Sequence, residues 1–319
     1  MALSFSSISA YTKQQIAPLL TEAVFSAKTQ ELIKQGGILL PKTKSAVAVP
    51  KLTTNANFQA DACGWNASGT TTLSQATVTV GKIKIEEAIC TKDFEAYFSQ
   101  EALRAGSTYE DFGWADFQTK FASQKNRVIA KQLEIAIWQG DTGSASENLK
   151  RFDGLQKLIA AGSPVDANVS GYVSGGTIST LTQTNIVSAL QGIYKAIPVE
   201  IVDAEDLYIF VGFDAYRLAV LAYQAVNLYN YQIDASNERM FVIPGTNAKL
   251  VAVNGLNGTG DMYATTLSNI AMAFDLETEE ENYTIWYSKD TNEVRYRVAF
   301  KMGVNVAYTQ FVVKFISTI

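Results

Sequence analysis

A long amphipathic segment at residues 114–138 constrains the fold of this chain more than any other feature. Apolar residues recur along it every three or four positions, which places them on one stripe of an α-helix. The stripe consists of Phe117, Phe121, Ile129, Leu133 and Ile137, with Trp114 and Val128 beside it. The opposite side carries Lys120, Gln124, Arg127, Lys131 and Glu134. About 25 residues at 1.5 Å each give a rod of roughly 37 Å, about twice the usual helix length, which indicates the spine of a thin, extended subunit.

The composition excludes several functional classes. With 319 residues, 47% of them hydrophobic, the chain can bury one large core or two ordinary ones. The net charge of −5 argues against a protein whose main role is to grip nucleic acid. The sequence contains no apolar run of the roughly 18 residues that a membrane span needs. It also shows no secretory signal, so we expect a cytoplasmic protein without a membrane partner.

The absence of histidine is the most informative single count. It removes imidazole-based catalysis and histidine-ligated metals, and two cysteines, Cys63 and Cys90, cannot complete a cysteine-only zinc site. We expect both thiols to be reduced, and we expect no metal and no cofactor. Chemistry based on carboxylates, lysine or tyrosine stays open.

The first 90 residues predict a helix, two short strands and a long hairpin. Residues 11–35 form a helical pattern that ends at Gly36. Strands are expected at residues 38–40 and 46–49, the second closed by Pro50. Later, Val78 and Val80 alternate with threonines, and the apolar phase slips at Gly81, which predicts a β-bulge. A thinly apolar hairpin is marginal alone, so we expect it to lie on a neighbouring subunit; an ordinary surface hairpin or a mobile loop is the alternative.

The second half of the chain predicts a compact unit followed by three strands. Helices are expected at residues 183–196 and 213–226, and strands at residues 207–211, 249–253, 262–266 and 270–274, after a Gly/Ser/Thr-rich connector at residues 161–180. The last strands are expected at residues 283–288, around 294–301, and 304–315. In the middle one, Val294, Tyr296, Val298 and Phe300 face one way and Arg295, Arg297 and Lys301 the other. This alternation is typical of antiparallel strands with one solvated face.

The candidate sites all have simpler explanations than catalysis. Gly255 to Gly260 lacks the lysine of a phosphate-binding loop and is best explained as a turn between strands. The acidic residues Glu277, Glu279, Glu280 and Glu281 could chelate a cation, but a solvated connection or a partner for a basic face is favoured. Arg295, Arg297 and Lys301 favour a solvated face or an intersubunit ion-pair row over phosphate binding. Asp141, Asp153 and Ser144 fit turn chemistry, and Trp138 fits a core position.

The order of elements and several short motifs resemble the major capsid proteins of tailed bacteriophages, which share the HK-ninety-seven-type shell fold. The motifs are Ile137-Trp138-Gln139-Gly140-Asp141, Phe152-Asp153-Gly154-Leu155, Cys63-Gly64-Trp65, residues 82–90 and Phe300-Lys301-Met302-Gly303-Val304. The Cys-Gly-aromatic motif and the motif within residues 82–90 are most similar to capsid proteins of phages that infect Bacteroidetes. Trp138, Gly140, Asp141, Phe152, Asp153 and Gly154 would then be fold-defining residues.

This resemblance implies an α+β subunit with an N-terminal arm (residues 1–49), an extended loop (50–87), a peripheral domain with the spine helix (88–179), an axial domain (180–268) and peripheral C-terminal strands (269–319). The implied function is a non-enzymatic one. The chain would form hexamers and pentamers that close into an icosahedral head around double-stranded DNA, assembled in the host bacterial cytoplasm. Portal, scaffold or decoration proteins would be its virion partners. Because the sequence starts at Met1, we expect no cleaved scaffolding segment, and no crosslink is assigned.

Head-to-tail contacts around a ring use two different patches of each subunit, and obligate interfaces bury roughly 2,000 Å² or more, which arms and hairpins supply. The candidate intersubunit contacts are Trp65, Val78, Val80, Lys82, Lys84, Arg295, Arg297 and Lys301. Two alternatives stay open. One is an encapsulin-type nanocompartment with the same fold, and the other is a carboxylate-dependent hydrolase that uses residues such as Asp141 and Asp153.

Overall fold

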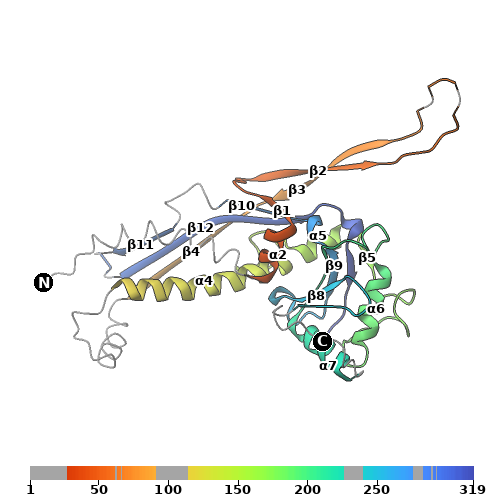
Figure 1. Ribbon diagram of the computed structural model, residues 1–319. Helices are drawn as coiled ribbons and strands as arrows, with labels where there is room; N and C mark the ends of the chain where they lie inside the picture. The colour runs from red at the N-terminus through yellow and green to blue at the C-terminus, as the bar shows by residue number, and fades with distance from the viewer. Residues whose placement is uncertain are drawn as a thin grey trace.

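The computed structural model describes residues 27–61, 63–65, 67–90, 114–225, 240–275, 283–288, 290–291 and 293–319. It has the expected α+β architecture: a long helix beside a long sheet, a compact unit at one end, and a two-stranded hairpin that projects from the body (Figure 1). None of the described helices is both long and apolar enough to cross a membrane.

The spine helix, α4 (Trp114–Gln139), is confirmed with 26 residues. Ile129, Leu133 and Ile137 of the expected stripe are buried, whereas the side chains at positions 114–122, including Phe117 and Phe121, lie outside the described ones. Two assignments on this helix are wrong. Val128 is half exposed, and Glu134 is buried at 1% exposure. The C-terminal part of α4 is covered by both α2 (Lys28–Gly36) and η1 (Asn254–Leu256), so its buried arc is wider than a single stripe.

The long sheet lies beside α4 and is built around β12 (Glu293–Val306). Its order is β1 (Ile38–Leu40), β10 (Ile270–Asp275), β12 and β11 (Tyr283–Ser288), and β4 (Gly81–Cys90) also pairs with β12. The expected alternation in β12 is confirmed, because Tyr296, Val298 and Phe300 are buried in the core shared with α4. Of the expected N-terminal helix, residues 28–36 form α2, and residues 11–26 lie outside the described residues.

The compact unit contains the second sheet, with order β5-β13-β9-β6-β8-β7. Its strands are β5 (Val165–Asp166), β6 (Leu207–Val211), β7 (Met240–Val242), β8 (Lys249–Ala252), β9 (Met262–Thr266) and β13 (Val313–Phe315). The helices α6 (Ile186–Ala196) and α7 (Phe213–Ala225) pack against it and share one hydrophobic core with it (Figure 1). The short helix α5 (Leu155–Ala161) follows the end of α4.

The expected third terminal strand at residues 304–315 is wrong. β12 continues to Val306, the chain then turns through η4 (Thr309–Phe311), and β13 joins the sheet of the compact unit instead. Asn269 makes this turn, because its backbone oxygen accepts a hydrogen bond from Ala307 N and its side chain accepts one from Tyr308 N, at 2.9 and 2.7 Å. The compact unit therefore also includes β5 and β13, which lie outside residues 180–268.

The hairpin consists of β2 (Ala46–Thr54) and β3 (Thr71–Thr79), paired antiparallel over their full lengths. The expected strand end at Pro50 is wrong. Both the N–H and the C=O of Leu52 point away from β3, towards Tyr308. By the alternation of antiparallel pairing, the nitrogen of Pro50 points to the same outer edge, where a missing donor costs no ladder hydrogen bond.

The expected β-bulge at Gly81 is also wrong. Val78 belongs to β3, whereas Ile83 and Ile85 belong to β4, which pairs with β12 in the long sheet. The apolar phase slips because the chain changes sheets. At the crossing, a Cβ on Gly81 would lie 1.9 Å from the backbone oxygen of Arg151, so only glycine fits. The hairpin therefore spans residues 46–79 rather than 50–87.

Candidate assembly surfaces

The root of the hairpin is fixed to the body of its own chain. Val49 and Val78 pack on Ala271 and Ala273 of β10 and on Ala307. Tyr308 binds the outer edge of β2, since its hydroxyl accepts from Leu52 N at 3.2 Å and donates to Leu52 O at 3.4 Å. Val78 is 0% exposed, so its assignment as an intersubunit contact is wrong, because β10 and Ala307 of its own chain already cover it. Val80 is half-buried.

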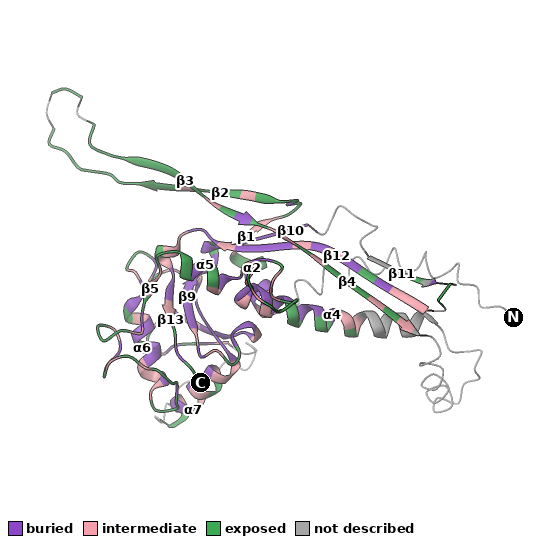
Figure 2. Cartoon of the chain, turned by 180° about the vertical axis from the view of Figure 1, so that it is seen from behind, coloured by how far each residue is buried: buried purple, intermediate pink, exposed green. Residues whose placement is uncertain are grey.

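The distal part of the hairpin carries large apolar side chains that its own chain leaves exposed (Figure 2). Leu52 and Leu73 face each other across the strands and are 59% and 75% exposed. Because the backbone of Leu52 points outwards, this is a non-hydrogen-bonded pair, in which side chains lie closest. Phe58 and Trp65 are 104% and 96% exposed. Trp65, one of the expected contact residues, is thus exposed to a partner. Leu52, Leu73 and Phe58 were not among the expected contacts, because no sequence pattern distinguishes them.

The basic residues of β4 and β12 form ion pairs within the chain. Lys84 lies 2.8 Å from Glu86, which also pairs with Arg297 at 3.5 Å. Lys301 lies 3.6 Å from Asp275, and Arg295 lies 3.9 Å from Glu293. Hydrogen bonding from Lys84 is the main cause that lowers the pKa of Glu86. The pairs of Glu86 and Glu293 are solvent-exposed, and such pairs are worth little, whereas the Asp275 side chain paired with Lys301 is buried. A role for these basic residues between subunits stays a prediction. Lys82 is exposed and has no carboxylate partner in the part of the chain that the structure describes.

The fold-defining residues predicted after the spine helix meet in one tight junction. Gly154 N donates to Gly140 O at 2.8 Å, which brings the two glycine backbones together. A Cβ on Gly140 would lie 2.5 Å from Ala136 O and 2.6 Å from Phe152 O, and one on Gly154 would lie 2.5 Å from Gly140 N. Trp138 and Phe152 are buried beside this junction. The glycines are therefore required by backbone contact between the end of α4 and the start of α5.

Asp141 and Asp153 lie close together in this junction and share Lys157. The Lys157 Nζ atom is 2.7 Å from Oδ1 of each carboxylate. Its hydrogen bond is the main cause that lowers the pKa of Asp141. For Asp153, desolvation opposes the shift, but hydrogen bonds from Lys157 and Thr142 outweigh it and lower the pKa. Both carboxylates are thus held ionised. The sequence reasoning missed Lys157, although its spacing of four residues from Asp153 was a usable signal.

A buried polar network joins α2, α4 and η1. Trp138 Nε1 donates to Thr29 Oγ1 at 2.9 Å, and the Thr29 hydroxyl donates to Glu134 Oε1, also at 2.9 Å. The helix α2 has no side-chain cap from its own N-cap residue, Ala27, and Glu134 accepts from the first backbone N–H groups of α2 instead. Burial is the main cause that raises the pKa of Glu134, against these hydrogen bonds. Sequence reasoning had placed Glu134 on the exposed side.

The other candidate sites contain no catalytic arrangement. Residues 255–260 lie between β8 and β9, which confirms the turn, and a Cβ on Gly255 would lie 2.3 Å from Cδ1 of Trp138. The acidic run from Glu277 to Glu281 lies outside the described residues. Within the described ranges, no group of three or more Cys, Asp or Glu side chains could hold a metal ion.

Comparison with known proteins shows which solved structures share this architecture. No protein-family model and no curated protein matches the sequence. A chain of the procapsid of satellite phage P4, a structure that includes its size determination protein, aligns with a TM-score of 0.62 at 13% identity over 94% of this chain and 90% of that one. The capsid of the native GTA particle aligns with a TM-score of 0.54 at 10% identity, and Mycobacterium phage Bobi with 0.52 at 10%, each over 90% of both chains. The chain has the HK-ninety-seven-type capsid fold.

The match to the satellite phage P4 procapsid chain covers nearly the whole of this chain. A virus-like particle from Pyrococcus furiosus also aligns, with a TM-score of 0.50 at 8% identity over 98% of this chain and 100% of that one. The expected preference for phages of Bacteroidetes finds no support among these neighbours. At these identities the likeness concerns the fold, and function has to be argued from the surfaces of the subunit.

Proposed function

We propose that this chain is the major capsid protein of a tailed bacteriophage, which assembles into hexamers and pentamers and closes into an icosahedral shell around double-stranded DNA. The observation that carries this proposal is the hairpin on a capsid-type fold. Its root is packed on the chain, and its distal apolar residues Leu52, Phe58, Trp65 and Leu73 are exposed. Monomeric proteins rarely expose large apolar groups together, and such groups mark contacts with other chains.

The parts of the subunit then take the roles expected from the resemblance. The hairpin is the extended loop that lies on an adjacent subunit. The spine helix and the long sheet form the peripheral domain, and the second sheet with α6 and α7 forms the axial domain. Of the expected N-terminal arm, residues 27–45 precede the hairpin. Portal, scaffold or decoration proteins would be further partners, and the assembled protein would be located in the virion after assembly in the bacterial cytoplasm.

A shell that encloses protein is the second candidate, because a virus-like particle from Pyrococcus furiosus shares the fold. The two candidates share the fold and the hairpin contact, so the contents of the particle decide between them. Genome-length DNA inside purified particles supports the phage head. A stoichiometric cargo protein without such DNA supports the nanocompartment.

An enzymatic role is not favoured. The only carboxylate pair that sequence reasoning put forward, Asp141 and Asp153, is neutralised by Lys157. A general acid needs a pKa raised towards the working pH, whereas both pKa values are lowered. The arrangement stabilises the junction between α4 and α5 instead.

The test is assembly of the purified chain, with and without the distal hairpin. Wild-type protein is expected to elute at the void volume in size-exclusion chromatography and to show closed particles in negative-stain microscopy. In the test variant, residues 56–69 are replaced by Asn-Gly, which suits a tight turn closed by the hydrogen-bonded pair Asn55 and Thr70. The control variant Glu200→Ala removes one exposed side chain from the body.

We expect the hairpin variant to keep its circular dichroism spectrum and to stay a small oligomer, while Glu200→Ala assembles. Normal particles from the hairpin variant would contradict the role of the hairpin. A wild-type protein that stays a compact monomer at all concentrations would contradict the proposed function.

A further inference from the structure

A pocket beside the spine helix carries positive charge that the chain itself does not neutralise. It has a volume of about 280 Å³ and lies where α2, α4, η1 and the start of α7 meet. Among its described lining residues, Lys28, Arg127 and Lys131 are cationic and Glu134 alone is acidic. Pockets for drug-sized ligands measure about 300–1,000 Å³, so a cavity of this size suits a single anionic group.

Two of the three cations have no counterion. Arg127 and Lys131 lie four positions apart on α4, so they are neighbours on one side of the helix, and both are exposed. Neither forms an ion pair with any residue of the described ranges, whereas Lys28 pairs with Glu31 at 3.3 Å. Like charges at this spacing destabilise a helix. An anion between the two side chains would remove that cost.

Glu134 does not supply this anion. Its carboxylate accepts hydrogen bonds from the backbone N–H and the hydroxyl of Thr29, at 3.4 and 2.9 Å, and from the backbone N–H groups of Lys28 and Asn254. None of the groups that act on this carboxylate is a lysine or arginine side chain. The same hydrogen bonds occupy the first N–H groups of α2. An anion in the pocket therefore has to be held by the side chains of α4.

We infer that this pocket binds a phosphate group, held by Arg127 and Lys131 with Lys28 at its edge. The planar guanidinium of arginine forms two parallel hydrogen bonds to phosphate oxygens, and the ammonium of lysine adds a point charge. A phosphate group has enough acceptor oxygens for both cations to bind it at once. The inference goes beyond the proposed function. The group can belong to a nucleic-acid backbone or to a free phosphate ion, and the experiment distinguishes the two.

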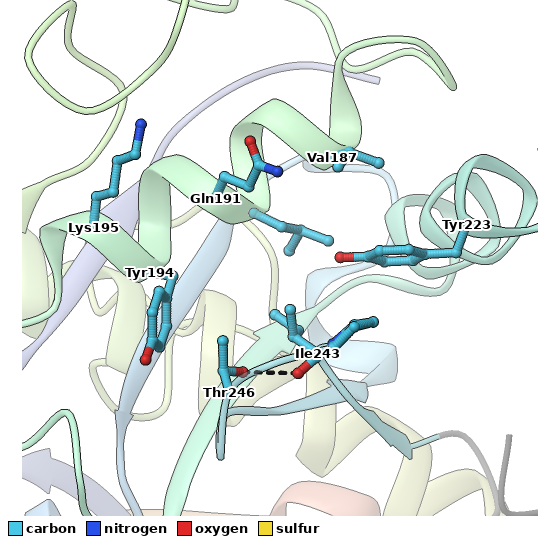
Figure 3. A pocket seen from close by; sticks show the side chains of 9 residues that line it. Val187, Gln191, Tyr194, Lys195, Tyr223, Ile243 and Thr246 are labelled. Carbon is cyan, nitrogen blue, oxygen red and sulfur yellow. Dashed lines mark hydrogen bonds between the residues drawn. The ribbon is translucent and has the colours of Figure 1, made fainter. Parts of the chain in front are cut away.

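The first arm measures binding of radiolabelled inorganic phosphate to unassembled full-length subunits by equilibrium dialysis. Arg127→Gln and Lys131→Gln are each expected to weaken binding by about tenfold, because each removes charge-assisted hydrogen bonds. The matched control is Lys195→Gln, which also removes one exposed lysine without an ion-pair partner in the described part of the chain. Lys195 lies at a different pocket, whose lining includes Tyr194 and Tyr223 and is mainly apolar (Figure 3). This control is expected to bind phosphate as the wild type does.

The second arm identifies the source of the phosphate group. A fluorescently labelled DNA duplex is titrated with the same subunits at several salt concentrations, and binding is followed by anisotropy. If the backbone of DNA occupies the pocket, Arg127→Gln and Lys131→Gln each reduce the slope of log affinity against log salt by about one, and inorganic phosphate competes with the duplex. If these substitutions abolish binding of inorganic phosphate and leave the duplex unaffected, the ligand is the free ion. Both results support the site.

The third arm separates a lost ligand contact from a damaged fold. In chloride buffer without phosphate, Arg127→Gln is expected to unfold at the wild-type temperature or slightly above it, because a like-charge contact is removed. At equal ionic strength, phosphate should raise the unfolding temperature of the wild type by more than that of Arg127→Gln, since only a bound ligand stabilises through mass action. A lower unfolding temperature of Arg127→Gln in chloride would show that Arg127 supports the fold and would overturn the inference.

The remaining outcomes keep this inference apart from the proposed function. Wild-type subunits that bind neither inorganic phosphate nor the duplex would overturn the phosphate site, as would equal losses of phosphate binding in Arg127→Gln and Lys195→Gln. Since all three arms use unassembled subunits, such a result leaves the shell function standing. Failure of the wild-type protein to form particles would contradict the shell function and leave the phosphate site standing.

Discussion

The hydroxyl of Thr29 offers the sharpest test of how the N-terminal segment is held to the spine. It accepts a hydrogen bond from Trp138 Nε1 and donates one to Glu134 Oε1, and all three side chains are buried. Thr29→Val keeps the shape of the side chain and removes both hydrogen bonds. It leaves a buried indole N–H without its acceptor and deprives a buried carboxylate of one donor, each of which costs about 1–3 kcal/mol.

The expected total loss is about 2–5 kcal/mol of the free energy of unfolding. For a chain of this length, an unfolding entropy near 2.1 cal/mol/K per residue converts that loss into a decrease of about 3–8 °C in the unfolding temperature. The assay is thermal unfolding of unassembled subunits, followed by tryptophan fluorescence and by calorimetry. The matched control is Thr29→Ser, which keeps the hydroxyl and removes one methyl group, at a cost of about 0.8 kcal/mol. If valine is tolerated as well as serine, the hydrogen-bonded network contributes nothing and the reasoning is refuted.

Three further perturbations test the same end of the spine. Burial raises the folded-state pKa of Glu134, so the stability that protonated Glu134 contributes is present below the unfolded pKa near 4.5 and is lost as the pH rises. Urea titrations at several pH values should therefore show the wild type losing stability relative to Glu134→Gln as the pH rises. Parallel curves of stability against pH for the two proteins would contradict this. Gly140→Ala forces a Cβ to within 2.6 Å of two backbone oxygens, so we expect the free energy of unfolding to fall by about 3 kcal/mol or more, or the protein to be insoluble. The control is Gly143→Ala, because its added Cβ would lie 3.3 Å from its nearest contact, Asp141 Oδ1. Lys157→Ala should lower the free energy of unfolding at neutral pH, because Lys157 lowers the pKa values of Asp141 and Asp153. The difference from wild type should disappear as acid protonates the two carboxylates. A difference that persists at low pH would assign the effect to packing.

The regular elements of this chain were predictable because their apolar residues repeat with one period over many positions. The spine helix, β9 and β11 have the expected bounds to within one residue, and α7 is described from Phe213 to Ala225, with its expected last position, residue 226, outside the described residues. The alternation in β12 correctly predicted its buried face. Local periodicity locates such elements even where more than one partner covers them, as in β9, whose Tyr263 packs in the core shared with α4 and whose Met262 and Ala264 pack in the core of the compact unit.

The errors occur where one element meets two partners or changes partner. Glu134 was assigned to solvent because the contribution of α2, more than 100 residues away in sequence, is invisible to a helical pattern. The slip at Gly81 has the same sequence pattern as a bulge, although the strands on its two sides belong to different sheets. The end of β12 was misplaced because Asn269 turns the chain at Ala307. The junction at Gly140 and Gly154 was located by its motif, but its partner Lys157 was not.

The distribution of apolar side chains along the hairpin bears on the stability of the proposed assembly. The root buries Val49 and Val78 in its own chain, whereas the apex is held beyond the reach of any described core. Burial of an aromatic side chain such as Trp65 removes about 150–250 Å² from water, worth roughly 4–6 kcal/mol before ordering costs. Those costs, and the loss of free motion on association, are of similar size, so a single contact of this kind is weak. In a closed ring each subunit is both donor and acceptor of a hairpin, and losing one subunit breaks two such contacts at once. The geometry of the hairpin therefore favours assemblies that close over those that stay open.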